Sequence, residues 1–141
     1  MDKKVKYVIL FLVLISICSC NKKSSDSKSN DEVTDIYFPE KIHDFGSINQ
    51  GDRVGTAFEF TNTGKNDLII TDAIGSCGCT VPDYPKNAIK PGENGIIKVL
   101  FNTTGKSGVQ NKTVTITANT TTGTEILNIK ANVIPRIGIA Q

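Results

Sequence analysis

Two cysteines near the middle of the chain, Cys77 and Cys79, are the residues best suited to chemistry, because we expect both to keep free side chains in the mature protein. Residues two apart in an extended strand share a face, with Cα atoms about 6.5 Å apart. That spacing is at the upper limit for a disulfide. Gly78 between them allows a tighter bend, so an oxidising compartment would favour a small, strained disulfide. A strained disulfide is easily reduced, and a redox role is therefore physically sensible.

The Cys77-Gly78-Cys79 motif has two further interpretations, and the sequence leaves them open. Two thiolates on one face suit a soft ion such as Cu(I) or Zn(II). A closed zinc site needs four ligands, however, and nothing in the spacing places His43, the only histidine, near the cysteines. The remaining interpretation is structural, with packed thiols or a local cross-link that shapes a bulge. The two-residue spacer of thiol oxidoreductases is absent from the motif.

Other polar residues give weaker signals. His43 beside Asp44 suggests acid–base chemistry, although a histidine before a Phe-Gly pair is more typical of packing or of a turn. No serine has the context of a nucleophile elbow, and the glycines do not form a phosphate-binding loop. We therefore expect no cofactor and no catalysis, with a thiol oxidoreductase as the only enzymatic alternative. Acidic residues at expected strand ends are interpreted as solvated caps: Asp67, Asp72, Asp83 and Glu93.

The first 33 residues are typical of export and tethering. Three lysines precede an apolar run over 7–17, which has the length of a signal-peptide core. This run is shorter than the roughly 20 residues that span a bilayer. The segment from Ile17 to Cys20 resembles a bacterial lipobox, so we predict a signal peptide over 1–19 and lipidation of Cys20 by acyl chains such as palmitate, which would anchor the protein. Residues 20–33, which are rich in Ser, Asp, Asn and Lys, are predicted to be a disordered tether.

Composition limits the classes of partner. Of the 141 residues, 38% are hydrophobic and 21% are charged, which is enough apolar material for one modest core. The chain has 16 basic and 14 acidic residues. Three of these lysines and one aspartate lie among the first six residues, so the remainder carries 13 charges of each sign. A neutral domain without a basic run gives no electrostatic reason to bind nucleic acid.

Residues 34–141 are predicted to form one all-β domain. The clearest strand is 127–133, where apolar and polar residues alternate as a half-buried antiparallel strand requires. Turn sequences occur at 62–66, 90–95 and 120–123, and the last is expected to close a hairpin. About seven short strands predict an immunoglobulin-like antiparallel β-sandwich of two sheets, without the Cys…Trp…Cys core of antibody domains. The other predicted strands are 35–38, 54–60, 68–74, 97–101 and 113–118.

Several motifs resemble those of a bacterial secreted family. Residues 43–51 (HDFGSINQG) resemble its opening FG-x-I-x-x-G, and residues 58–64 (FEFTNTG) resemble its F-x-F-x-N-x-G strand and turn. Residues 76–80 (SCGCT) and then 91–95 follow in the family order. The pattern is similar to the domain-of-unknown-function family 1573, whose members are hydin-like and major-sperm-protein-like immunoglobulin sandwiches. The resemblance extends to about residue 133; it implies the fold and compartment but no reaction, since the family has no settled activity.

These features predict a lipid-anchored, immunoglobulin-like module of the bacterial envelope. We expect it to contact the membrane through Cys20, and a protein or envelope partner through a sheet edge or the Cys77–Cys79 loop. The expected location is the periplasmic face of the outer membrane, because Lys22 and Lys23 stand where related lipoproteins carry an acidic surface-export signal. The alternative function is thiol redox chemistry or the handling of a soft metal, copper or zinc, through the two cysteines.

Overall fold

The structure, a computed structural model, describes residues 33–136, and within them every regular element is a β-strand. Alternating apolar and polar residues produce these strands, because successive side chains point to opposite faces. Residues 33–136 include no helix that could cross a membrane. The strands are β1 (Ile36–Tyr37), β2 (Ile42–Asn49), β3 (Arg53–Asn62), β4 (Ile70–Gly75), β5 (Thr80–Asp83), β6 (Asn94–Asn102), β7 (Gly108–Ala118) and β8 (Thr124–Ile134).

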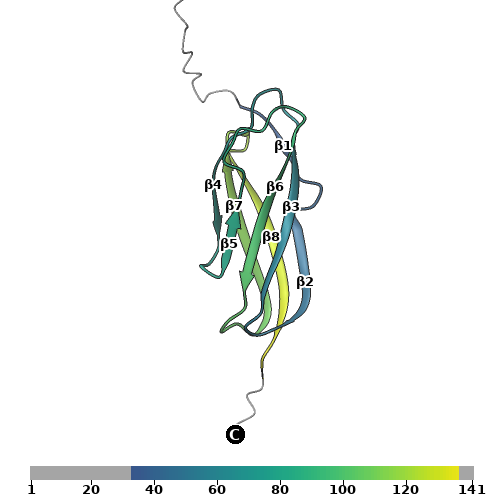
Figure 1. Ribbon diagram of the computed structural model, residues 1–141, viewed down its shortest axis with the longest axis vertical. Helices are drawn as coiled ribbons and strands as arrows, with labels where there is room; N and C mark the ends of the chain where they lie inside the picture. The colour runs from purple at the N-terminus through teal and green to yellow at the C-terminus, as the bar shows by residue number, and fades with distance from the viewer. Residues whose placement is uncertain (1–32, 137–141) are drawn as a thin grey trace, which may run out of the picture.

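The strands form two four-stranded sheets that pack face to face (Figure 1). One sheet has the order β1-β3-β6-β5 and the other has the order β2-β8-β7-β4. These orders correspond to the ABED and CFG sheets of an immunoglobulin domain, with β2 added beside the last strand. All strand pairs are antiparallel except β2 and β8, which run parallel. The predicted immunoglobulin-like sandwich is confirmed, with eight strands in place of about seven.

Two of the eight strands, β2 and β5, were not predicted, and each has a local cause. In β2 the pairing with β8 shifts between Asp44 and Ser47, so the alternation of inward and outward side chains is broken. Gly46, with φ +66°, lies within this bulge. The other strand, β5, has only four residues, and one of them is Pro82. The predicted hairpin at 120–123 is confirmed, since β7 and β8 pair on either side of it.

The hydrophobic core lies between the sheets and is formed by the inward faces of both. The rings of Phe38 and Phe60 lie 5.6 Å apart near one end of this core. Gly95, opposite Phe60 on β6, leaves room for that ring, because a Cβ at this position would overlap it. The largest fully buried apolar side chains are Phe60, Phe101, Leu68, Ile97, Ile116, Leu127, Ile129, Val99, Val114 and Val133.

A fully buried asparagine, Asn62, ties together the segments at the end of β3. Its Oδ1 accepts hydrogen bonds from the Thr34 hydroxyl (2.9 Å) and the Gly64 N–H (3.1 Å). Its Nδ2 donates to the carbonyl oxygens of Asn66 and Ile89, both at 2.8 Å. An asparagine side chain has two donors and two acceptor lone pairs, so every position is used. The Asn of the F-x-F-x-N-x-G motif is thus a structural junction.

Candidate functional site

The turn between β4 and β5 carries both candidate cysteines and links the two sheets (Figure 1). Cys77 and Cys79 form a disulfide with a Cα–Cα distance of 5.2 Å. This distance is shorter than the value expected for an extended strand, because the chain turns here. The turn is closed by the Thr80 N–H, which donates to the Cys77 carbonyl oxygen at 3.0 Å. The tighter bend that the intervening glycine was expected to allow is therefore present.

The disulfide lies half-buried on a surface that carries exposed apolar side chains. Val81 is 57% exposed and Leu100 is 59% exposed, and the two are opposite each other on β5 and β6. They line a hollow of about 260 Å³ together with Cys79 and Arg53. Because the two sulfurs are bonded to each other, neither is a thiolate that could hold a soft metal. Within residues 33–136, no three His, Cys, Asp or Glu side chains are grouped as metal ligands.

The structure does not bring His43 to the cysteines. His43 lies on β2 and the disulfide follows β4, and these two strands are the opposite edges of one sheet. The His43 ring packs edge-on against Phe45, with centroids 4.6 Å apart. Asp44 accepts a hydrogen bond from the Gly46 N–H at 2.8 Å and so supports the β2 bulge. The packing and turn roles expected for these residues agree with this geometry; Cys20, the predicted lipidation site, lies outside the described residues.

Sheet edges are the other predicted contact surface, and the backbone of β5 is closed to a further strand. The Asn102 N–H of β6 donates to the Cys79 carbonyl at 2.9 Å, so Cys79 faces β6. Alternation then directs Thr80 and Pro82 outward. The Thr80 N–H is already bonded to Cys77, and proline has no N–H. The outward side of β5 therefore offers no free donor from either residue.

The edge of β4 is occupied by side chains. Its outward-facing Thr71 carbonyl accepts a hydrogen bond from the Tyr84 hydroxyl at 3.0 Å. The Ala73 N–H donates to the Asp72 carboxylate at 2.8 Å, which is the capping role expected of that acid. Gly75 packs so closely on the β5 backbone that a Cβ there would overlap it. The side of the sandwich formed by β4 and β5 is thus protected against strand addition.

The edge of β2 is interrupted by its bulge. The Gly46 N–H is bonded to Asp44, and the Asn49 N–H donates to the Asp52 carboxylate at 3.0 Å. Bulges and side-chain caps of this kind are the usual protection of an exposed strand. No long, regular row of free backbone groups is left on this strand in the described region.

In contrast, the edge of β3 is open along 55–59. The Asn62 N–H donates to the Glu93 carbonyl at 3.0 Å, so Asn62 faces β6. Alternation then directs the N–H and C=O groups of Gly55, Ala57 and Glu59 away from β6. Within residues 33–136 these six backbone groups have no hydrogen-bond partner. We call this row the β3 edge.

The β3 edge is open because β1 ends early. β1 pairs with β3 at two positions only, Ile36↔Asn62 and Tyr37↔Thr61, and both lie at the end of β3. Continuing the same register would place Pro39 opposite Glu59. Proline cannot donate a hydrogen bond to the ladder, so pairing ends there, and the chain crosses to the other sheet to form β2. Sequence reasoning missed this edge, although Pro39 was the signal that could have located it.

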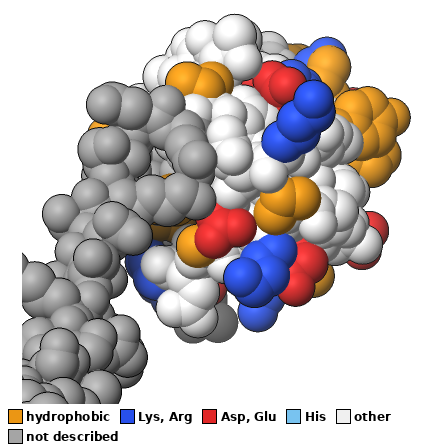
Figure 2. Space-filling view, turned by 90° about the horizontal axis from the view of Figure 1, so that it is seen from above, with side chains coloured by type: hydrophobic (Ala, Val, Ile, Leu, Met, Phe, Trp, Pro, Cys, Tyr) orange, Lys and Arg blue, Asp and Glu red, His pale blue; other side chains and the backbone are white. Residues whose placement is uncertain are grey.

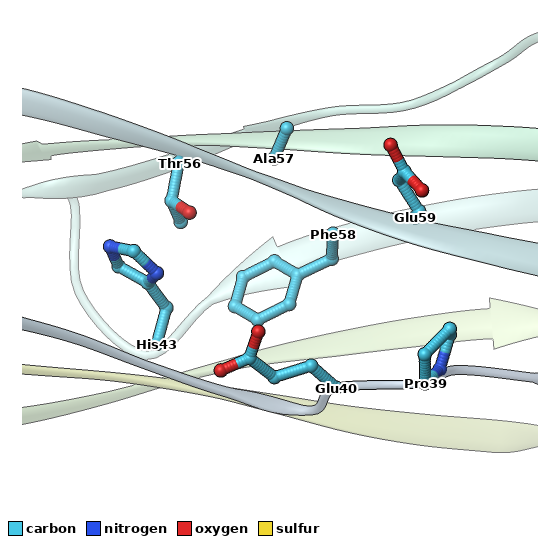
Figure 3. Close-up of a pocket in the computed structure, with 7 residues that line it drawn as sticks. All are labelled: Pro39, Glu40, His43, Thr56, Ala57, Phe58 and Glu59. Carbon is cyan, nitrogen blue, oxygen red and sulfur yellow. The ribbon is translucent and has the colours of Figure 1, made fainter.

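A hollow of about 190 Å³ lies beside the β3 edge, between β3 and the start of β2 (Figure 3). We call it the edge hollow. His43 and Thr56 point toward one another across it, and the Phe58 ring lies between the two strands. The Glu40 side chain, from the segment before β2, also lines the hollow. Sites for small molecules usually enclose about 300–1,000 Å³, so the edge hollow suits a single side chain better. It is also lined by Pro39, Ala57 and Glu59.

Where Figure 2 shows described residues, this end of the sandwich carries no large patch of one kind. Hydrophobic, acidic and basic side chains are interspersed on the part of this face that the described residues form. Two ion pairs are formed within residues 33–136, Lys41 with Glu125 and Arg136 with Asp52. The described part of this end therefore offers no strongly charged surface as a further candidate site beside the Cys77–Cys79 turn and the β3 edge.

Fold and site together define the class of protein: an immunoglobulin-like sandwich with a cross-linked turn on one side and an open strand edge on the other. The model of the family "Protein of unknown function (DUF1573)" matches residues 36–133, and the chain belongs to this family. The resemblance drawn from the motifs is therefore confirmed. No curated protein matches the sequence.

Solved structures of low sequence identity share the fold. A protein of unknown function from Porphyromonas gingivalis W83 gives a TM-score of 0.63 at 15% identity, over 77% of this chain and 51% of that protein, so this chain spans about half its length. The ASH / PapD-like domain 7 of human CEP192 gives a TM-score of 0.56 at 11% identity, over 79% of this chain and 92% of that domain. The secreted serine protease VesC from Vibrio cholerae gives a TM-score of 0.55 at 14% identity, over 74% of this chain and 24% of the protease. At these identities the likeness concerns the fold alone.

Proposed function

We propose that the protein is a lipid-anchored, periplasmic binding or scaffold module of the bacterial envelope that acts without catalysis. The observation that carries the proposal is the β3 edge, where six backbone groups at Gly55, Ala57 and Glu59 have no partner within residues 33–136, while the edges of β2, β4 and β5 are interrupted or capped. An open edge of this kind pairs with an extended segment of another protein, and its main-chain hydrogen bonds supply the affinity. The small hollows and the family's immunoglobulin-like fold support binding over chemistry.

A capture experiment with a backbone variant tests the proposal. The full chain is purified from envelope membranes in detergent and used to capture partners from an envelope extract. Ala57→Pro removes an outward N–H without touching the β3–β6 ladder, so we expect folding to persist and partner capture to be lost. Ala57→Val keeps the N–H and is the matched control. Capture that is equal for Ala57→Pro and the unchanged chain refutes binding at this edge.

The lipid anchor has its own test, since Cys20 lies outside the described residues. Replacing the predicted acylation site by Cys20→Ser removes the thiol that would carry the acyl chains. We expect the variant to lose its labelling by a radioactive or clickable palmitate analogue and to leave the outer-membrane fraction. Full labelling of Cys20→Ser would refute the anchor.

Thiol–disulfide exchange is the second candidate, and it would act through the half-buried Cys77–Cys79 disulfide. A thiolate of a partner dithiol attacks one sulfur, forms a mixed disulfide and releases the other sulfur as a thiolate. The partner's second thiol then closes its own disulfide. This chain gains two electrons and two protons, and the partner is oxidised. Soft-metal handling requires the same reduction first, because only the reduced pair offers thiolates.

Alkylation separates the two candidates. The native protein is treated with a thiol-alkylating reagent before and after incubation with a dithiol such as reduced dithiothreitol. Exchange predicts labelling of Cys77 and Cys79 only after the dithiol, with the fold intact, and loss of cellular function in the double variant to Ser. A binding module predicts that the double variant keeps partner capture.

A further inference from the structure

We infer that the segment bound at the β3 edge is basic, and that it places a lysine or arginine side chain in the edge hollow against Glu40. This inference rests on the proposed function, because it names the chemistry of the partner at the same edge. Within residues 33–136 it is carried by the direction of the free backbone groups, by the two unpaired carboxylates beside them, and by the shape of the hollow.

The backbone of the β3 edge sets the length and periodicity of the partner segment. From Gly55 to Glu59 the free row covers five residues, or about 17 Å at 3.4 Å per residue. A segment paired with this row has side chains that alternate between the outer face of the sheet and the space between the sheets. The residues of the bound segment opposite Thr56 and Phe58 therefore point inward to the edge hollow, and those opposite Ala57 and Glu59 lie on the outer face.

The charges beside the β3 edge are acidic and unpaired. Glu40 and Glu59 are both exposed, and within residues 33–136 neither forms an ion pair. The adjacent cation, Lys41, is held by the Glu125 carboxylate at 2.6 Å. Lys98 lies on β6, across β3 from the edge, and pairs with neither acid. A basic segment bound here could thus place one cation in the edge hollow beside Glu40 and another on the outer face beside Glu59.

The shape of the edge hollow fits a long basic side chain. One wall is the buried Phe58 ring, Thr56 and His43 face each other beside it, and the exposed Glu40 also lines the hollow (Figure 3). A lysine or arginine can bury its apolar stem along such a wall while its charged end reaches an acid at the rim. An aspartate or glutamate in the same place would meet Glu40 with like charge, which disfavours binding.

Peptide display tests the inference directly. A library of random decapeptides is selected against the full chain purified in detergent and against three variants. We expect peptides selected on the unchanged chain to be enriched in Lys or Arg at one position of an alternating pattern. The double variant Glu40→Lys with Glu59→Lys should lose this enrichment. A selected peptide, labelled with fluorescein, should bind about fivefold more weakly when its basic residue is replaced by Gln, as for a solvent-accessible ion pair.

Two backbone variants distinguish a failure of the basic-segment inference from a failure of the proposed binding at the β3 edge. Ala57→Pro should abolish selection and Ala57→Val should keep it, while thermal denaturation confirms that both are folded. Selected peptides without basic enrichment, but still lost with Ala57→Pro, overturn the basic partner and leave strand addition intact. Selection unaffected by Ala57→Pro overturns both. Self-association of the unchanged chain in sedimentation, lost with Ala57→Pro, makes a second copy the occupant and also overturns the inference.

Discussion

Replacing the buried junction residue, Asn62→Ala, should destabilise the domain strongly, and the hydrogen bonds allow the cost to be estimated. The Ile89 carbonyl keeps its bond from the Leu68 N–H at 2.8 Å, and the Thr34 hydroxyl, released from Asn62, can donate its one hydrogen to the Asn66 carbonyl 3.0 Å away. Two donated bonds are then lost without stranding an acceptor, at about 0.5–1.5 kcal/mol each.

The Gly64 N–H is the group that Asn62→Ala leaves without a partner. An unsatisfied backbone donor costs about 1–3 kcal/mol, and the half-buried position of Gly64 favours the lower part of that range. The sum is about 3 kcal/mol. Small domains have a free energy of unfolding of only about 5–15 kcal/mol, so a shift of this size is easily measured.

Urea denaturation followed by circular dichroism measures the effect of Asn62→Ala, with Asn87→Ala as the matched control at an exposed position. The control should change the free energy of unfolding by less than about 0.5 kcal/mol. Asn62→Asp keeps the side-chain shape but directs a second acceptor at the Asn66 and Ile89 carbonyls, so it should cost at least as much as alanine. A loss below about 1 kcal/mol for Asn62→Ala, with an unchanged m-value, would refute the account of the junction.

Two further predictions concern the turn and the core. The Cys77–Cys79 disulfide closes a loop of three residues, which by loop-closure entropy is worth about 1.6 kcal/mol, so the double variant to Ser should fold and lose about that much in urea denaturation. A loss above about 4 kcal/mol would contradict this estimate and show that the disulfide also stabilises the packing of the two sheets. Gly95→Ala places a methyl group against the Phe60 ring and should cost about 1–3 kcal/mol as overpacking. A neutral result in thermal denaturation would contradict the close packing of ring and backbone.

Much of the fold follows from local alternation. The predicted strands that became β3, β6, β7 and β8 are those whose inward positions are apolar, apart from Thr56 on β3, since one buried face imposes a period of two. β2 could not be found this way, because its bulge at Gly46 moves the inward position by one residue. Its parallel pairing with β8 joins residues that are far apart in sequence, and no local pattern encodes such a pairing.

The candidate site was only partly predictable. The Cys77-Gly78-Cys79 spacing indicated that a disulfide was feasible, and the turn that brings the two Cα atoms to 5.2 Å depends on hydrogen bonds to residues of β5 and β7. The open edge depends on where β1 ends relative to β3, which is a question of register. Register is set by the packed sheets and not by either strand alone. Pro39 marks the end of β1 only once that register is known.

The parallel pairing of β2 with β8 has a mechanical consequence. β1 begins near one end of the sandwich and β8 finishes at the other (Figure 1). Tension applied between the two ends of the chain therefore pulls β2 and β8 in opposite directions along their common axis. The ladder of paired residues, from Ile42↔Asn128 to Asn49↔Ile134, is then loaded in shear and shares the force. In a domain held at its beginning and pulled at its end, the pairs of this ladder would therefore bear the load together and not one after another.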